Sequence, residues 1–403
     1  MNRKQLLLIV AAGLLLGGFG WHLHRQKSAS FEHGGKTTSE KLLGDFPVND
    51  VAQITIRHST NELNLVKGEV WSVKERADYP ADAGEIIEFA RKLWDLHAAQ
   101  SQGIGQSQLG RLELLPPGRG GTNSATLVEL KGKDGKLIRS VLLGKKSMRA
   151  GGDESPGGGW PNGRWICLPD KPGTAYVVGE TFDRVEPKPE EWLSKDFIRV
   201  EKPKSIEVAF PVPTNSWKLT RETESGEWKL ADAKPGEQLD SSKIAGVSNP
   251  FGSPGFTDVL PAADVQKSGM DKPTVVTIDT FDNFAYTLTV GQKTNDDYPL
   301  SLNVAAHLPK ERTPGKDEKP EDKTRLDKEF QDNQKKLESK LGQEKKFENW
   351  IYLVSNWTVE PVLKERAQLL AEKKEEPKPG EKSSTNDVNA VTNFLSPPDD
   401  SKR

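Results

Sequence analysis

The sequence contains a single cysteine, so no disulfide can form within the chain. That residue, Cys167, lies inside the apolar run from Trp165 to Leu168. A lone cysteine in such a run is typical of a small buried hydrophobic residue, and we predict that role in preference to a nucleophile. The 403 residues are enough for two or three domains of ordinary size, so hydrophobic cores can supply the stability.

Histidine is also scarce, and the motifs of common catalytic and metal sites are missing. No His-x-x-x-His or Cys-x-x-Cys spacing occurs, which argues against a zinc site. Gly144-Lys145 resembles the end of a phosphate-binding loop, but Arg139 stands where that loop needs its first glycine. No Gly-x-Ser-x-Gly frame is present. We therefore predict no catalytic residues, no metal ligands, no cofactor-binding residues and no cofactor.

An excess of one charge sign is absent as well. The chain has 57 Lys and Arg against 59 Asp and Glu, a net charge of -2, which offers no electrostatic case for binding nucleic acid. Hydrophobic residues make up only 34% of the chain. This fraction is low for a chain packed throughout, so we expect some segments to remain solvated.

One long apolar run is present, at the N-terminus. Arg3 and Lys4 precede an uncharged stretch from Gln5 to Leu23, and about 18 helical residues span roughly 27 Å, enough for a bilayer core. No Ala-x-Ala-like cleavage site follows. We predict an uncleaved transmembrane signal anchor at residues 1–25 and a linker at 26–45. The short N-terminal flank favours a single-pass protein of the bacterial inner membrane with its bulk in the periplasm.

After this anchor, the sequence presents the same order of apolar motifs twice. Alternating apolar residues are typical of strands with one buried face. We predict an α+β fold of two tandem β-rich repeats, residues 46–200 and 201–371, each with an antiparallel meander, a helix, a hairpin and closing strands. The paired motifs are Trp71-Ser-Val73 with Trp228-Lys-Leu230, Gly144 with Gly291, and Trp165-Ile-Cys-Leu168 with Trp350-Ile-Tyr-Leu353.

Each repeat is expected to carry one helix after its meander. In the first, Asp82 is a suitable N-cap, and apolar residues at helical spacing continue to Ala98, so the helix is predicted to end near Gln100. Ile86 and Ile87 both belong to this broad apolar face. The second repeat has a shorter helix, predicted at about 240–247.

The two repeats differ in their insertions. Residues 145–163 are Gly-rich and predict a surface loop. Residues 310–346 are densely charged, and apolar residues share one face of a predicted helix within them: Leu326, Phe330, Leu337 and Leu341. We weigh a protruding arm and a helix packed on its own sheet equally. Residues 372–403 are mainly Lys, Glu, Pro and Ser and are predicted to be a disordered tail.

Four residues are candidates for binding. Asp78 and Asp82 flank the corner where the first meander meets its helix, and Tyr79 between them could stack on a ligand. Two carboxylates about 5–9 Å apart could also serve as acid and base in glycoside hydrolysis. A turn residue and a helix N-cap are the simpler interpretation, and we favour it. Trp160 lies in the Gly-rich loop, where it could bind a glycan or peptide or simply hold the loop.

The motifs together resemble a known bacterial family, the domain of unknown function 4340. The resemblance rests on the N-terminal anchor and on a series of segments: Trp71-Ser-Val73, Tyr79-Pro80-Ala81-Asp82, Leu143-Gly144, Trp165-Ile166, Tyr176-Val177-Val178 and Glu191-Trp192-Leu193. It implies a membrane-anchored extracytoplasmic protein that accompanies an ABC-type transport system similar to gliding-motility components. It supplies no catalytic residues.

Two functions are consistent with these observations. The first is a membrane-tethered extracytoplasmic binding or scaffold protein, an accessory component of an ABC-type transport complex, whose partners are the inner membrane and a membrane protein complex. The alternative is an envelope hydrolase acting on glycan or peptide, with Asp78, Asp82 or the Trp160 loop near its site.

Overall fold

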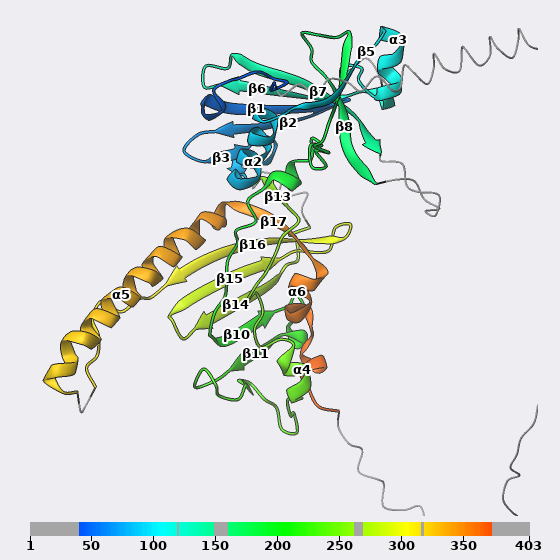
Figure 1. Ribbon diagram of the computed structural model, residues 1–403. Coiled ribbons are helices and arrows are strands. Elements are labelled where there is room, and N and C mark those ends of the chain that lie inside the picture. The colour runs from blue at the N-terminus through cyan, green and yellow to red at the C-terminus, as the bar shows by residue number, and fades with distance from the viewer. Residues whose placement is uncertain (1–39, 119–120, 149–159, 262–268, 316–317, 373–403) are drawn as a thin grey trace, which may run out of the picture.

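The computed structural model describes residues 40–118, 121–148, 160–261, 269–315 and 318–372 (Figure 1). The predicted anchor at 1–25, most of the linker and of the Gly-rich loop, and the tail beyond residue 372 lie outside these ranges. Among the described helices, none combines the length and the apolar character needed to span a bilayer.

The first repeat is built on a nine-stranded antiparallel sheet. Its strand order is β4-β3-β2-β1-β6-β7-β8-β9-β5. Helix α2 (Ala83–Trp94) joins β4 to β5, and the short helix α3 (Gln106–Leu109) follows β5. The strands are β1 (Val51–His58), β2 (Asn61–Lys67), β3 (Trp71–Val73), β4 (Tyr79–Pro80), β5 (Ala98–Gly103), β6 (Thr126–Gly132), β7 (Leu137–Met148), β8 (Pro161–Cys167) and β9 (Thr174–Val178).

The second repeat is built on an eight-stranded antiparallel sheet in the order β12-β11-β10-β14-β15-β16-β17-β13. Alternating apolar residues explain strands such as β14 and β15, whose side chains are buried at every second position. The strands are β10 (Pro203–Ala209), β11 (Trp217–Thr220), β12 (Lys229–Leu230), β13 (Asp258–Pro261), β14 (Thr274–Thr280), β15 (Phe284–Val290), β16 (Asp297–Ala306) and β17 (Trp350–Ser355). Its helices are α4 (Ser241–Ala245), α5 (Pro320–Glu344) and α6 (Asn356–Leu363).

The two sheets share one strand order. With β4 set aside, β3-β2-β1-β6-β7-β8-β9-β5 matches β12-β11-β10-β14-β15-β16-β17-β13 position by position. The connections also match, because α2 precedes β5 and α4 precedes β13. The α+β class and the antiparallel sheets predicted from the sequence are therefore confirmed.

The strand order corrects one pairing made from the sequence. Trp165 lies in β8, whereas Trp350 begins β17, which holds the position of β9. The equivalent of β8 is β16, which contains no tryptophan, so the shared Trp-Ile motif marks buried strands and not equivalent ones. The predicted loop at 145–163 is also too long, because β7 extends to Met148 and β8 begins at Pro161. The shorter Gly-rich connection joins β7 to β8, whereas the charged insert corresponds to the β8–β9 turn.

The predicted end of the first helix is also wrong. Helix α2 ends at Trp94, because the residues from Ala98 onward form edge strand β5 and pair with β9. Hydrogen bonds to a neighbouring strand replace the helical bonds there, which propensity alone does not reveal. Asp82 is confirmed as the N-cap, since its carboxylate accepts a hydrogen bond from the Glu85 backbone N–H at 3.1 Å.

The charged insert combines both arrangements considered from the sequence. Helix α5 extends away from the second sheet as a single arm (Figure 1). Near its C-terminal end, Leu337 and Leu341 pack against the hydrophobic core. Towards its N-terminal end, Leu326 and Phe330 are only partly buried. The apolar stripe thus anchors one end of the helix and continues along the projecting part.

Cys167 is buried, as predicted. Desolvation raises the pKa of its thiol, and nearby Asp170 acts in the same direction. Its neighbours are the apolar residues of a second core cluster that includes Leu109, Leu114 and Leu142. Both observations favour a packing role over a reactive thiolate.

The cleft between the repeats as candidate functional site

An extended segment, residues 193–200 and here called the connecting segment, joins the two repeats and makes contacts with both. Leu193 forms a β-bridge with Ala81, and the Ser194 N–H donates to the Pro80 carbonyl at 2.9 Å, so the segment lies along the outer edge of β4. It then reaches the second repeat, where the Val200 N–H donates to the Phe251 carbonyl at 3.0 Å. Both halves therefore hold the connection by backbone hydrogen bonds, which limits its freedom.

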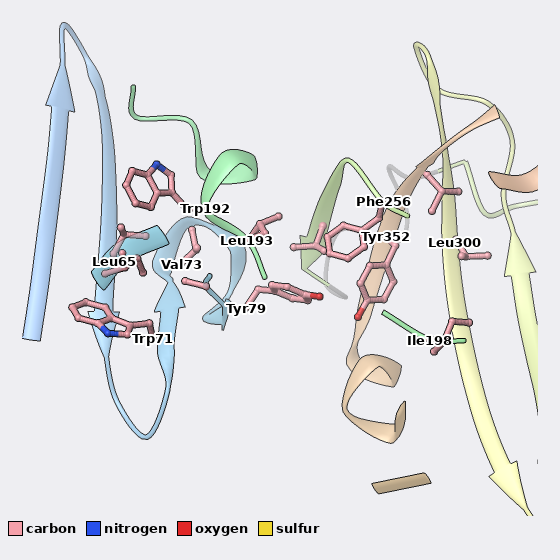
Figure 2. Close-up of a cluster of buried hydrophobic side chains, with 14 of the residues drawn as sticks. Leu65, Trp71, Val73, Tyr79, Trp192, Leu193, Ile198, Phe256, Leu300 and Tyr352 are labelled. Carbon is pink, nitrogen blue, oxygen red and sulfur yellow. The ribbon is translucent and has the colours of Figure 1, made fainter. Parts of the chain in front are cut away.

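Aromatic side chains fill the junction. Figure 2 shows Tyr79 directed from β4 towards Tyr352 of β17 and Phe256. The Tyr79 ring lies edge-on to Trp350, Phe256 and Tyr352, with centroid distances of 4.9, 5.9 and 6.1 Å. Phe197 of the connecting segment packs on the same Tyr352 ring, with the two ring centroids 4.4 Å apart. The edge-to-face pairs that Tyr79 makes add to the hydrophobic stabilisation of a core.

An ion pair joins the repeats beside this aromatic cluster. The Arg76 guanidinium, in the 3₁₀ helix η2 (Lys74–Arg76), donates to both Asp258 carboxylate oxygens of β13, at 2.7 and 2.8 Å. Glu190 lies 3.7 Å from the same guanidinium. The hydrogen bonds that Asp258 accepts raise the pKa of the Arg76 guanidinium, although burial acts in the opposite direction. A bidentate pair fixes orientation as well as distance, so it aligns β13 with the first repeat.

A large open cleft lies at this junction, with a volume of about 1820 Å³. One wall comes from β3, β4 and the exposed side of α2, and the other from the connecting segment, the C-terminal end of α5 and Trp350. Two exposed apolar side chains line it, Val70 (63% exposed) and Ile87 (61% exposed). Charges of both signs surround them, among them Lys67, Glu69, Arg91, Lys195, Asp196 and Lys346.

The cleft also contains one buried carboxylate. Glu344, at the end of α5, is 5% exposed, and it accepts hydrogen bonds from the Tyr286 hydroxyl at 2.7 Å and the Arg199 N–H at 3.1 Å. Lys340 lies 3.8 Å away. Desolvation raises the pKa of Glu344, although these hydrogen bonds and Lys340 oppose the shift. The side chain ties the arm to the connecting segment.

Replacing Glu344 with glutamine is expected to change how stability depends on pH. A carboxyl whose pKa is raised on folding binds more protons in the folded state, so its contribution to stability falls as pH rises above the unfolded pKa. Glu344→Gln removes this dependence. We expect the free energy of unfolding of the variant to rise relative to that of the wild type as the pH is raised from about 4 to 8. Urea unfolding at several pH values measures the difference.

Glu338→Gln, on the exposed side of the same helix, is the matched control and should follow the wild-type profile. A constant difference between Glu344→Gln and the wild type at all pH values would contradict a raised pKa at this position.

The structure separates the four sequence candidates. Tyr79 is 1% exposed, so its ring packs on protein aromatics and offers no free face to a ligand. Burial raises its pKa to about 12. Asp82 lines the cleft while its carboxylate caps α2. Asp78 has a left-handed backbone conformation and pairs with Lys74 at 2.8 Å. Trp160 is 85% exposed, in the β7–β8 connection.

The sequence did not single out the residues that shape the cleft. Val70 follows Gly68-Glu69 in a turn, where nothing in the pattern marks it as exposed next to a cavity. Ile87 was assigned to the buried face of α2, but adjacent residues of a helix point about 100° apart, so Ile86 and Ile87 cannot both face the core centre. Ile86 is buried and Ile87 is exposed. The sequence did contain one sign that Ile87 is exposed, because the apolar face of α2 is too wide for all of its residues to contact the core.

The comparisons with known proteins identify one family and no individual relative. A family model described as domain of unknown function (DUF4340) matches residues 71–273, about half of the chain. The match begins at β3 and ends just before β14, so it includes Tyr79, α2 and the connecting segment. No curated protein and no solved structure matches the chain.

Proposed function

The chain belongs to the DUF4340 family, and we propose that it is a membrane-tethered extracytoplasmic binding or scaffold protein. Its binding site is the cleft between the repeats. The observation that supports this proposal is the exposure of Val70 and Ile87 beside a large cavity, because exposed apolar side chains next to a concave surface favour interaction sites.

The size of the cleft favours a polypeptide as the bound partner. Small-molecule pockets have volumes of about 300–1,000 Å³ and enclose most of their ligand. The cleft has about 1820 Å³ and is open to solvent, so a small molecule would leave much of it unfilled. A segment of a partner protein could cover Val70 and Ile87 and pair its own charges with Lys67, Glu69 and Arg91.

The location of the partner follows from the predicted anchor. An apolar segment at residues 5–23 would hold the chain at the bacterial inner membrane with its bulk in the periplasm. We propose a membrane complex of the ABC transport type as the partner, as the family resemblance implies. The contacts of the two carboxylates argue against the envelope-hydrolase alternative, because Asp82 caps a helix and Asp78 is paired with Lys74.

Photo-cross-linking in cells tests the cleft. A photoreactive residue at position 70 or 87 is expected to capture one partner that mass spectrometry identifies as an ABC permease. Val212, 54% exposed on the second repeat and outside the cleft, is the control position. Ile87→Asp should reduce capture from position 70 about tenfold, and Val70→Asp should reduce capture from position 87 to the same extent, because a charge replaces apolar contact area. Both side chains are exposed, so stability should change by less than about 0.5 kcal/mol.

Capture at 70 and 87 that does not exceed capture at 212, in a stable protein at the membrane, would contradict the binding site. A soluble periplasmic partner captured specifically at 70 and 87 would contradict only the transport assignment.

A further inference from the structure

The cleft continues into a second cavity at one end of the first sheet, here called the hairpin groove. This groove has a volume of about 680 Å³ and is lined by the start of β1, the end of β2 and the turn between β6 and β7. Asn49, Val51 and Lys67 line both the cleft and the hairpin groove, so the two cavities adjoin. The concave surface available to a partner is therefore longer than the cleft alone.

Strand pairing places the lining of the hairpin groove at one end of the sheet. Val51 of β1 pairs with Gly132 at the end of β6, and β7 begins beside it at Leu137. Because β2 runs antiparallel to β1, it ends here at Lys67. The strands lie in the order β2-β1-β6-β7 (Figure 1). Neighbouring strands are about 4.8 Å apart, so the groove extends roughly 14 Å from β2 to β7, the length of about four extended residues.

Exposed apolar side chains occur in both cavities. Leu137, 54% exposed, lines the hairpin groove, whereas Val70 and Ile87 line the cleft. Seven large hydrophobic side chains are exposed among the described residues, and three of them line these two adjoining cavities. Single exposed hydrophobic residues are normal on a protein surface, but a group of them around a concavity is typical of an interaction site. The two cavities therefore favour one continuous binding surface.

The charges on this surface are unequal once those already engaged are set aside. The exposed basic side chains that have no ion-pair partner among the described residues are Lys67, Arg91, Lys133, Arg199 and Lys346. The exposed acidic side chains in the same condition are Asp50, Glu69 and Asp196. The remaining charges are engaged within the protein, through the pairs Lys340–Glu201 and Lys136–Asp134 and through hydrogen bonds of Lys195, Asp82 and Glu344. The unpaired charge is therefore predominantly positive.

The unpaired cations lie close to the exposed apolar side chains. Arg91 follows Ile87 by four residues on α2, so the two side chains share one face of the helix. Lys67 precedes Val70 by three residues, at the entrance to the β2–β3 turn. The hairpin groove has Lys133 in the β6–β7 turn. A bound segment that covers the apolar side chains will therefore bring its own polar groups close to these cations.

We propose that the partner binds this surface through an acidic segment, in which apolar side chains lie beside Asp or Glu, and that the segment continues from the cleft into the hairpin groove. The inference rests on the proposed function for the existence of a protein partner. Apolar side chains cover Val70, Ile87 and Leu137, and carboxylates face the unpaired cations around them. A bilayer surface is less suitable, because these side chains line concave surfaces that a planar membrane does not fill.

Photo-cross-linking in cells from position 137 tests the proposal. A photoreactive residue there is expected to capture the same protein as positions 70 and 87. Digestion of the cross-linked product and mass spectrometry identify the captured segment, which should contain more Asp and Glu than Lys and Arg.

Reversal of one charge tests the electrostatic part. Lys67→Glu should reduce capture from positions 87 and 137 about fivefold, because an attraction becomes a repulsion, whereas Lys67→Arg should retain capture. Lys335→Glu is the matched control, since Lys335 is exposed on α5 and lines neither cavity. All three positions are at the surface, so the variants should reach the membrane at wild-type levels.

The outcomes separate this inference from the proposed function. Capture of one protein at 70 and 87 but not at 137 would overturn the extension into the hairpin groove and leave the proposed function intact. A captured segment without an excess of Asp and Glu, or equal capture in Lys67→Glu and Lys335→Glu, would overturn the acidic partner. Cross-links to lipid, to a second copy or within the same chain would assign the surface to another occupant and reject the proposal. Absence of specific capture at all three positions would contradict the proposed function and the inference together.

Discussion

Replacing Tyr79 with alanine is expected to lower the free energy of unfolding by about 4 kcal/mol, the range typical of large aromatic residues in a core. The ring is 1% exposed and contacts three aromatic rings of the second repeat. Alanine would leave a cavity at the junction, and neither sheet could close it without moving the other. The loss should therefore weaken the association of the repeats as well as the first core.

Chemical denaturation monitored by tryptophan fluorescence measures this effect. The wild type is expected to unfold in one transition and Tyr79→Ala in two, because weaker coupling lets the repeats unfold separately. Tyr79→Phe retains the ring and its packing and should cost less than about 1 kcal/mol. Tyr79→Ala with wild-type stability but impaired partner capture would instead support the ligand-stacking role considered from the sequence.

The periodicity of the sequence was sufficient to predict the α+β class of fold and the presence of two repeats. Alternating residues such as those of β14 and β15 report burial directly, because each buried position removes apolar surface from water. The two hairpin glycines were also equivalent. A Cβ atom would lie 2.3 Å from the Leu112 carbonyl oxygen at Gly144 and 2.6 Å from Pro299 at Gly291, so both positions exclude side chains. Burial and lack of space for a side chain each act on a single residue, so they leave a pattern that can be read in the sequence.

The sequence did not reveal which strands of the two sheets are equivalent. The Trp-Ile motif suggested that β8 corresponds to β17. The order of the hydrogen-bonded strands shows instead that β17 holds the position in the second sheet that β9 holds in the first. A tryptophan needs a buried site large enough for its ring, and such sites occur on several strands of one sheet. The boundary of α2 was misplaced for a related reason. Whether residues after Trp94 continue a helix or pair with β9 depends on a strand almost eighty residues away.

The sequence singled out one corner of the cleft but not its exposed surface. The corner around Tyr79 and Asp82 does border the cleft. Its side chains have structural roles, however, while Val70 and Ile87 provide the exposed surface. A cleft between two repeats is defined by how they pack, and the packing depends on contacts such as Arg76 with Asp258 that are far apart in the sequence. No local motif encodes them.

Removing the Arg76 side chain is the second change for which we expect a large effect. Arg76→Ala leaves the partly buried Asp258 carboxylate without its bidentate partner, and breaking such a pair typically costs about 3 kcal/mol. The guanidinium and carboxylate are only 22% and 19% exposed, so solvent screens them weakly. Because the pair spans the junction, we also expect altered capture at the cleft positions 70 and 87.

Lys74→Ala is a stringent control, since Lys74 lies two residues away and its ion pair with Asp78 is about half exposed on both sides. Exposed pairs contribute about 0–1 kcal/mol, so this variant should remain close to the wild type. A double-mutant cycle of Arg76→Ala with Asp258→Ala should give a coupling energy of about 2 kcal/mol. Additive losses would mean that the two residues stabilise their own repeats independently, and the junction would then depend on the aromatic cluster around Tyr79.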